Sequence, residues 1–142
     1  MSYIIVAVLS MVFLFLGGIH FYWGFGGTWG GEAVIPTNPA GDKMLHPDMR
    51  ACLVVFAAFI FATWLLWQYI GWLPCWIPAQ WVRYGIMAML AAFLLRAAGD
   101  FKYVGFFKKI RSTKFARMDT KLFSPLCFLI AVLLLLVLIL ER

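Results

Sequence analysis

The stretch 123–140, FSPLCFLIAVLLLLVLIL, contains no charged residue and is long enough to cross a lipid bilayer as one helix. Three further apolar runs of similar length cover residues 3–25, 49–72 and 79–98. A hydrocarbon core of ~30 Å requires about 20 helical residues, each of which adds ~1.5 Å. The alternating pattern of a membrane β-barrel is absent from these runs. The sequence therefore predicts an all-α integral membrane protein that folds as a four-helix bundle.

The overall composition agrees with this fold class. Of the 142 residues, 65% are hydrophobic and only 13% are charged, which is more apolar surface than a soluble domain of this size can bury. The four runs account for most of the chain, so we predict a single transmembrane domain, 1–142. The first run has no basic leader and no small-residue cleavage site, so we interpret it as a retained helix and not as a secretory signal.

Basic residues are concentrated in the connector 99–122, whereas the turn 73–78 has none. Those of the connector are Lys102, Lys108, Lys109, Arg111, Lys114, Arg117 and Lys121. The positive-inside rule therefore predicts that this connector is cytoplasmic. Alternation of the spans then places the connector 26–48 in the cytoplasm and both termini on the external side. Arg83 and Arg142 run against the rule, but they are outnumbered.

The sequence gives no indication of a metal, a cofactor or nucleic acid. Cys52, Cys75 and Cys127 share no CxxC spacing and have no histidine beside them, which argues against a zinc site or a disulfide framework. A haem held between His20 and His46 would need both residues on facing helices, and His46 lies in a predicted loop. No nucleic-acid recognition fold accompanies the basic connector. We therefore expect no cofactor, no metal and no nucleic-acid partner.

The four predicted helices differ in the faces they present. The first and third runs carry small residues at helical spacing, which lets membrane helices approach closely, so we expect those faces to line the interior. The fourth run is uniformly apolar from Cys127 to Leu140. We expect it to pack on the outside of the bundle and to contact lipid. Ser124 suits the cap of this helix, and Pro125 suits its first position.

The residues with chemical potential fall mostly on one predicted side of the membrane. Arg96 can pair with Asp100 one turn later, or it can hold an anionic head group through its planar guanidinium group. Asp119 is either a salt-bridge partner for nearby cations or part of a site. Lys102 and Tyr103 belong to a segment of interleaved aromatic and basic residues, which is expected to lie in the membrane interface.

Topology brings several of these residues toward one candidate ligand-binding site, with no catalytic residue assigned. The predicted ligand-binding residues are His20, Trp23, Trp29, Arg96, Asp100, Lys102, Tyr103 and Asp119. The connector 26–48 contributes through its Gly- and Trp-rich start, which suits either an interfacial anchor or a turn that offers backbone N–H groups to an anion. A polar cluster in an otherwise inert bundle is typical of a functional site.

Five strings of residues resemble a known bacterial family of small four-span membrane proteins, the domain-of-unknown-function family 3995. They are GIHFYW (18–23), GGTWG (26–30), RAAGDFKYVGFFK (96–108), FARMDT (115–120) and SPLC (124–127). The string 96–108 is the most specific of them. The resemblance implies a protein of the bacterial inner membrane. It implies no activity, substrate or cofactor, so it transfers no catalytic role to any residue.

Three functions remain open at this point. The leading hypothesis is a small membrane protein that binds an anionic amphiphile or lipid head group at the cytoplasmic interface. The alternative is an accessory or self-assembling subunit, with a homo-oligomer or another membrane protein as partner. A further alternative is a membrane enzyme of lipid or quinone chemistry, for which only His20 with a carboxylate offers an acid–base pair. Membrane lipids are the expected partners.

Overall fold

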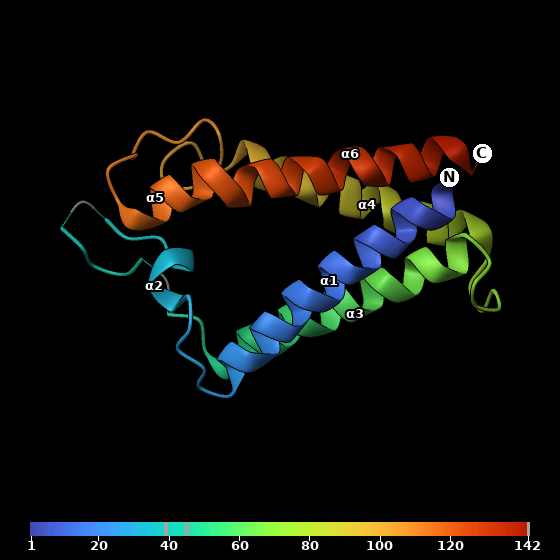
Figure 1. Cartoon of the computed structure of the whole chain (residues 1–142), viewed down its shortest axis with the longest axis horizontal. Helices are drawn as coiled ribbons and strands as arrows, with labels where there is room; N and C mark the ends of the chain where they lie inside the picture. Colours follow the sequence, from blue (N-terminus) through green and yellow to red (C-terminus); the bar gives the residue numbers. More distant parts are fainter. Residues whose placement is uncertain (39, 45, 142) are drawn as a thin grey trace.

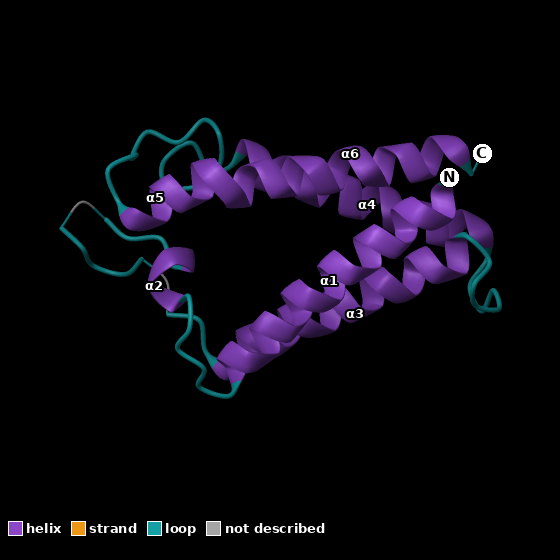
Figure 2. Ribbon diagram, viewed as in Figure 1, coloured by secondary structure: helices purple, strands orange, loops and turns teal. Residues whose placement is uncertain are grey.

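The computed structural model describes residues 1–38, 40–44 and 46–141, without the side chain of Glu32. The described chain is helical, with no strand and only one isolated bridge, between Thr37 and Lys43 (Figure 2). The four long helices are α1 (Ser2–Gly24), α3 (Met49–Tyr69), α4 (Ala79–Ala98) and α6 (Ser124–Leu140). The shorter elements are α2 (Gly31–Val34), α5 (Lys114–Met118) and the π-helical turn η1 (Asp119–Phe123).

Four helical segments in the described chain are long and apolar enough to cross a membrane. Three of them are α1, α3 and α4. The fourth is the whole segment Lys114–Leu140, of 27 residues, because α5, η1 and α6 follow one another without a break. The protein is therefore a multi-pass membrane protein built as an all-α four-helix bundle.

The start of the last helix differs from the prediction. Ser124 does not cap it, because Ser124 already has helical backbone angles. The cap is Thr113, whose side chain accepts a hydrogen bond from the backbone N–H of Ala116 at 3.1 Å. The prediction was wrong because Ser-Pro is a strong start signal by itself. Here the more polar residues 114–123 are also helical, so the helix begins before the apolar segment.

The long helices form two pairs. α1 packs along α3, and α4 packs along α6. The two pairs meet at the end of the molecule that carries both termini, and they diverge toward the other end (Figure 1). At the terminal end the Ser2 hydroxyl donates a hydrogen bond to the carboxylate of Glu141. Both long connectors lie at the opposite end, where α2 contacts α5. Which of the two ends faces the cytoplasm stays a prediction.

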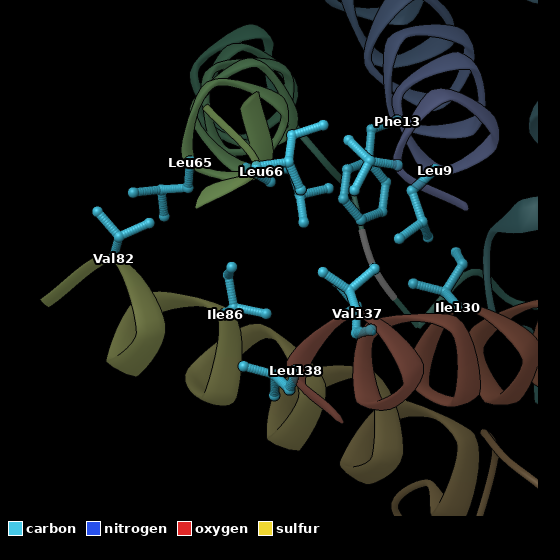
Figure 3. Packing of buried hydrophobic residues seen from close by; sticks show 13 residues of the cluster. Leu9, Phe13, Leu65, Leu66, Val82, Ile86, Ile130, Val137 and Leu138 are labelled. Carbon is cyan, nitrogen blue, oxygen red and sulfur yellow. The ribbon is translucent and has the colours of Figure 1, made fainter. Parts of the chain in front are cut away.

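The shared core lies where the two pairs meet. Leu9 and Phe13 of α1 and Leu66 of α3 pack there against Ile86 of α4 and Val137 of α6 (Figure 3). All five side chains are fully buried. Burial of such side chains stabilises the assembly through close packing, because in a membrane the lipid is as apolar as they are.

The expectation that the fourth span lies outside the bundle holds for one face only, where Phe128, Leu129 and Ile139 are exposed. Ile130, Ala131, Leu134 and Val137 form a buried stripe along α6, each at most 1% exposed. A helix that is apolar all round gives no sequence signal for the face it buries. Its place is decided by its neighbours, here α4 along most of its length and α1 near the terminal end.

Small residues do mark helix contacts, as expected. A Cβ atom added to Gly17 would lie 3.3 Å from Cβ of Phe59, so α1 and α3 approach closely at this point. A Cβ atom added to Gly85 would lie 2.9 Å from a methyl group of Leu65, where α4 meets α3. These glycines let the helix backbones come closer than larger side chains would permit.

Candidate functional site

One buried carboxylate organises the connector end of the bundle. Asp119, the first residue of η1, is fully buried. Its Oδ1 accepts a hydrogen bond from Nη2 of Arg96 at 3.0 Å. Its Oδ2 accepts from Nζ of Lys108 at 2.9 Å, from the backbone N–H of Gly105 at 2.8 Å and from Oγ of Ser124 at 3.1 Å. We call these five residues the Asp119 cluster. It ties α4, the connector and the start of α6 together.

The π-helical turn positions Asp119 within this cluster. The backbone N–H of Ser124 donates to the carbonyl of Asp119, five residues earlier, in place of the usual spacing of four. Short π turns of this kind occur often at functional sites of proteins. The side chains of Asp119 and Ser124 come together on the inner side of this turn, where Ser124 donates to the carboxylate.

The segment 99–107 folds back onto the end of α4 as a compact loop. The N–H of Phe106 donates to the carbonyl of Ala97 at 2.9 Å, which satisfies one of the last carbonyls of the helix. Gly99 and Gly105 both have positive φ, 88° and 89°. A Cβ atom on Gly99 would lie 1.8 Å from the carbonyl oxygen of Val104, so no side chain fits there. The two glycines of the family string are therefore required by a contact of backbone against backbone.

Asp100 closes this loop from within. Its Oδ1 accepts hydrogen bonds from the backbone N–H groups of Lys102, Tyr103 and Val104, at 2.9, 2.7 and 2.9 Å. Partial burial by itself raises the pKa of the Asp100 carboxyl, but the three N–H donors together outweigh burial and hold that pKa below its usual value. The expected alternative of an Arg96–Asp100 pair is replaced by the Arg96–Asp119 pair.

The charges of the Asp119 cluster do not balance. Asp119 is the one carboxylate in it, while Arg96 and Lys108 are both cations. Lys108 is only 2% exposed, and its Nζ also donates to the Gly105 carbonyl and to Oγ1 of Thr120, so its hydrogen bonds are fully used. The Arg96 side chain is 36% exposed, yet its Nη1 is buried and has no hydrogen-bond partner among the described residues. The surplus positive charge therefore lies with Arg96.

The structure divides the predicted site residues into two groups. Arg96 and Asp119 are in direct contact, and Asp100 shapes the loop beside them. Lys102 and Tyr103 lie in that same loop, with the Lys102 ammonium 5.1 Å from the centre of the Tyr103 ring. This group forms one continuous region at the end of α4.

The second group is His20 and Trp23 at the end of α1, with Trp29 in the connector that follows. Nδ1 of His20 lies 2.8 Å from the carbonyl of Leu16 in its own helix, and its ring packs against Trp23 and Phe59. Nε1 of Trp23 donates to the carbonyl of Trp29 at 2.8 Å. The end of α1 diverges from α4 and α6 (Figure 1), so the structure does not bring His20 and Trp23 to the Asp119 cluster.

The two connectors do meet, beside the start of α5. A pocket of about 330 Å³ lies there, lined by Thr28, Gly30, Ala33 and Lys114. Trp29 lies within this stretch of the first connector and is exposed. The connectors therefore lie at one end of the molecule. They contact each other at this pocket and not around His20.

Three residues of the cluster were not among the predicted ligand-binding residues: Gly105, Lys108 and Ser124. Lys108 was interpreted only as one of the basic residues that orient the connector toward the cytoplasm. The signal that was available is the family string 96–108, which both begins and ends with a cation. Within that string, the two glycines six positions apart indicated a turn rather than an extended segment.

Among the described residues no group of three or more His, Cys, Asp or Glu side chains could hold a metal ion. What the geometry defines is a class: a four-span membrane protein with a buried, positively biased ion cluster at one end. The family model described as "Protein of unknown function (DUF3995)" matches residues 13–134, and the chain belongs to this family. Comparison with curated proteins and with solved structures gave no match.

Proposed function

We propose that the connector end of the bundle binds the anionic head group of a membrane lipid, with Arg96 as the residue that contacts it. The observation that carries the proposal is the state of the Arg96 guanidinium group. One amino group is bound to Asp119, while the other is buried without an acceptor. A buried donor without a partner costs about 1–3 kcal/mol. An anionic oxygen that reaches the group after a small rotation of the side chain would recover that free energy.

The surrounding charge supports the same ligand class. Between residues 96 and 121 the sequence has eight Lys and Arg side chains against two Asp. Both ion pairs of the described residues are made to Asp119. The cations at the surface of this region are Lys102, Lys109, Arg111, Lys114, Arg117 and Lys121. Such a surface attracts anionic lipids by ~1 kcal/mol per basic residue, and guanidinium groups bind phosphate and carboxylate oxygens well.

Under this proposal the positively charged end lies at the cytoplasmic face of a bacterial inner membrane, with both termini outside. Lys102 and Tyr103 stand at the level of the head groups. His20, Trp23 and Trp29 anchor the end of α1 in the same interface, as aromatic residues commonly do. His20 and Trp23 do not contact the ligand in this proposal, because they lie on the other helix pair.

The test replaces Arg96 and measures the lipid retained by the purified protein. We expect Arg96→Gln to lose most of the co-purifying anionic phospholipid and Arg96→Lys to keep an intermediate amount, because an ammonium group cannot make two parallel hydrogen bonds. Arg50→Gln is the matched control, since Arg50 is an exposed arginine at the same end. Circular dichroism establishes that each variant is folded.

An unchanged lipid content in folded Arg96→Gln would rule the proposal out. Lys109→Gln combined with Arg111→Gln gives a second measurement, because neither side chain is part of the Asp119 cluster. We expect this double variant to weaken binding to anionic vesicles and to reduce its dependence on salt. Retention of full, salt-dependent binding by the double variant would contradict the role of the basic surface.

A further inference from the structure

A groove lies away from the Asp119 cluster, between α4 and α6. The two helices run side by side (Figure 1), and the groove of about 330 Å³ opens between them. Ala91 and Leu94 of α4 and Leu135 and Ile139 of α6 are among its lining residues. Its lining is apolar apart from Arg83, which lies toward the end that carries the termini. The volume is within the range of ligand pockets, ~300–1,000 Å³.

Arg83 is unusual in three respects. It lies within a membrane-spanning helix, where an ionisable residue needs a reason. It stands on the side of the membrane where the positive-inside rule would not place a cation. It also has no carboxylate within ion-pair distance among the described residues. Its Nη1 donates to the hydroxyl of Tyr69 at 3.4 Å, and the nearby Glu141 carboxylate binds Ser2 instead. Arg83 therefore has no ion-pair partner among the described residues.

The length of the groove along α4 is compatible with an acyl chain. From Arg83 to Leu94 the helix advances roughly 16 Å, at ~1.5 Å per residue. The hydrocarbon core of a bilayer is ~30 Å thick, so the groove is as long as the apolar part of one leaflet. Arg83 stands about one turn from the start of α4, on the side of the termini, and the rest of the lining extends from it into the apolar part of the span. This is the order of charge and hydrocarbon in a phospholipid.

We propose that the α4–α6 groove holds an acyl chain of an anionic phospholipid whose phosphate binds Arg83. The ligand belongs to the leaflet on the side of the termini, opposite to the leaflet addressed by Arg96. The phosphate neutralises Arg83. The acyl chain fills the groove beside Ala91, whose side chain is small. This site is independent of the function proposed for the connector end.

The experiment uses the full chain in nanodiscs that contain phosphatidylglycerol and phosphatidylcholine. In one sample phosphatidylglycerol carries a diazirine on its acyl chain, and in the other phosphatidylcholine carries it. After illumination, mass spectrometry of peptides counts crosslinks to the groove. We expect the wild-type protein to prefer phosphatidylglycerol at α4 and α6. Arg83→Gln should reduce that preference about tenfold, because a charge-assisted hydrogen bond is lost.

Two tryptophan variants keep the proposal testable if Arg83→Gln fails to fold. Ala91→Trp fills the groove and should abolish the preferred crosslinks. Ala92→Trp is the matched control, because Ala92 is the next residue, is exposed and does not line the groove. Equal crosslinking by the two lipids in the wild type, or equal results for the two tryptophan variants, would overturn the proposal. Arg96→Gln should leave the groove crosslinks unchanged, so the two proposed lipid sites can be tested independently.

Discussion

The ammonium group of Lys108 lies 2.9 Å from the carboxylate of Asp119, and both side chains are almost completely removed from solvent. A buried ion pair of this kind is held only when its remaining hydrogen bonds are satisfied. Gly105, Thr120 and Ser124 supply them here. The connector is thus fixed by an internal ion pair whose own hydrogen bonds are satisfied, and the exposed cations lie around it.

Asp119→Asn should destabilise the protein strongly. The substitution keeps the size of the side chain but leaves the Lys108 ammonium buried without a counter-charge, which typically costs ~3–5 kcal/mol. Thermal unfolding in detergent, followed by circular dichroism, measures the effect. Asp42→Asn is the control, since Asp42 is exposed and makes only local hydrogen bonds with Asn38. A midpoint shift no larger than that of Asp42→Asn would show that the ion pair contributes little.

The double variant Lys108→Met with Asp119→Asn should be more stable than Asp119→Asn alone. Removing the ammonium group removes the uncompensated charge, and methionine occupies a similar volume. The same unfolding measurement compares the two variants. If the double variant were less stable by the sum of both single effects, the two residues would not be coupled.

Gly99→Ala should disrupt the connector, whereas Gly71→Ala should be tolerated. Both glycines have positive φ, so both substitutions carry the ~1–2 kcal/mol cost of the left-handed region. Only at Gly99 does the new methyl group also collide with backbone, at 1.8 Å from the Val104 carbonyl oxygen, while Gly71 has open space. Limited proteolysis of the connector reports the outcome. Equal resistance of the two variants would contradict the backbone contact.

The loop closed by Asp100 should open in acid. The pKa of this carboxyl is lower in the folded protein than its ordinary value of 3.8. Its contribution to stability is therefore complete above about pH 4 and is lost as the pH falls through the depressed value. Hydrogen exchange of the Lys102, Tyr103 and Val104 amides follows the change. In Asp100→Ala these amides should exchange rapidly at every pH, and persistent protection would refute the assignment.

The predicted sidedness can be tested with a native thiol. Cys75 is exposed in the turn between α3 and α4, which is predicted to be external. A membrane-impermeant maleimide should therefore label it on intact cells, and Cys75→Ser should remove that label. In the Cys75→Ser background, Ser112→Cys introduces an exposed thiol in the connector, which should react only after the cells are opened. The reverse pattern would invert the whole topology.

The candidate site was only partly predictable from sequence. Arg96, Asp100 and Asp119 could be selected because charges near membrane spans are rare and conspicuous. Lys108 could not be separated from its basic neighbours, because the sequence does not show which lysine turns inward. The inclusion of His20 followed from its sharing one end of the bundle with Arg96. His20 and Arg96 are nevertheless apart, because the two helix pairs diverge toward the connector end.

The amino-acid sequence by itself determined the four membrane-spanning helices, their approximate bounds and the grouping of both long connectors at one end. It does so because the length and polarity of each run fix whether it crosses a bilayer. Only the tertiary structure decided which face of the last helix is buried, that Asp119 joins Arg96 to Lys108, and that a groove leads from Arg83. These features depend on which faces pack together, and a uniformly apolar helix such as α6 carries no local signal of its partner.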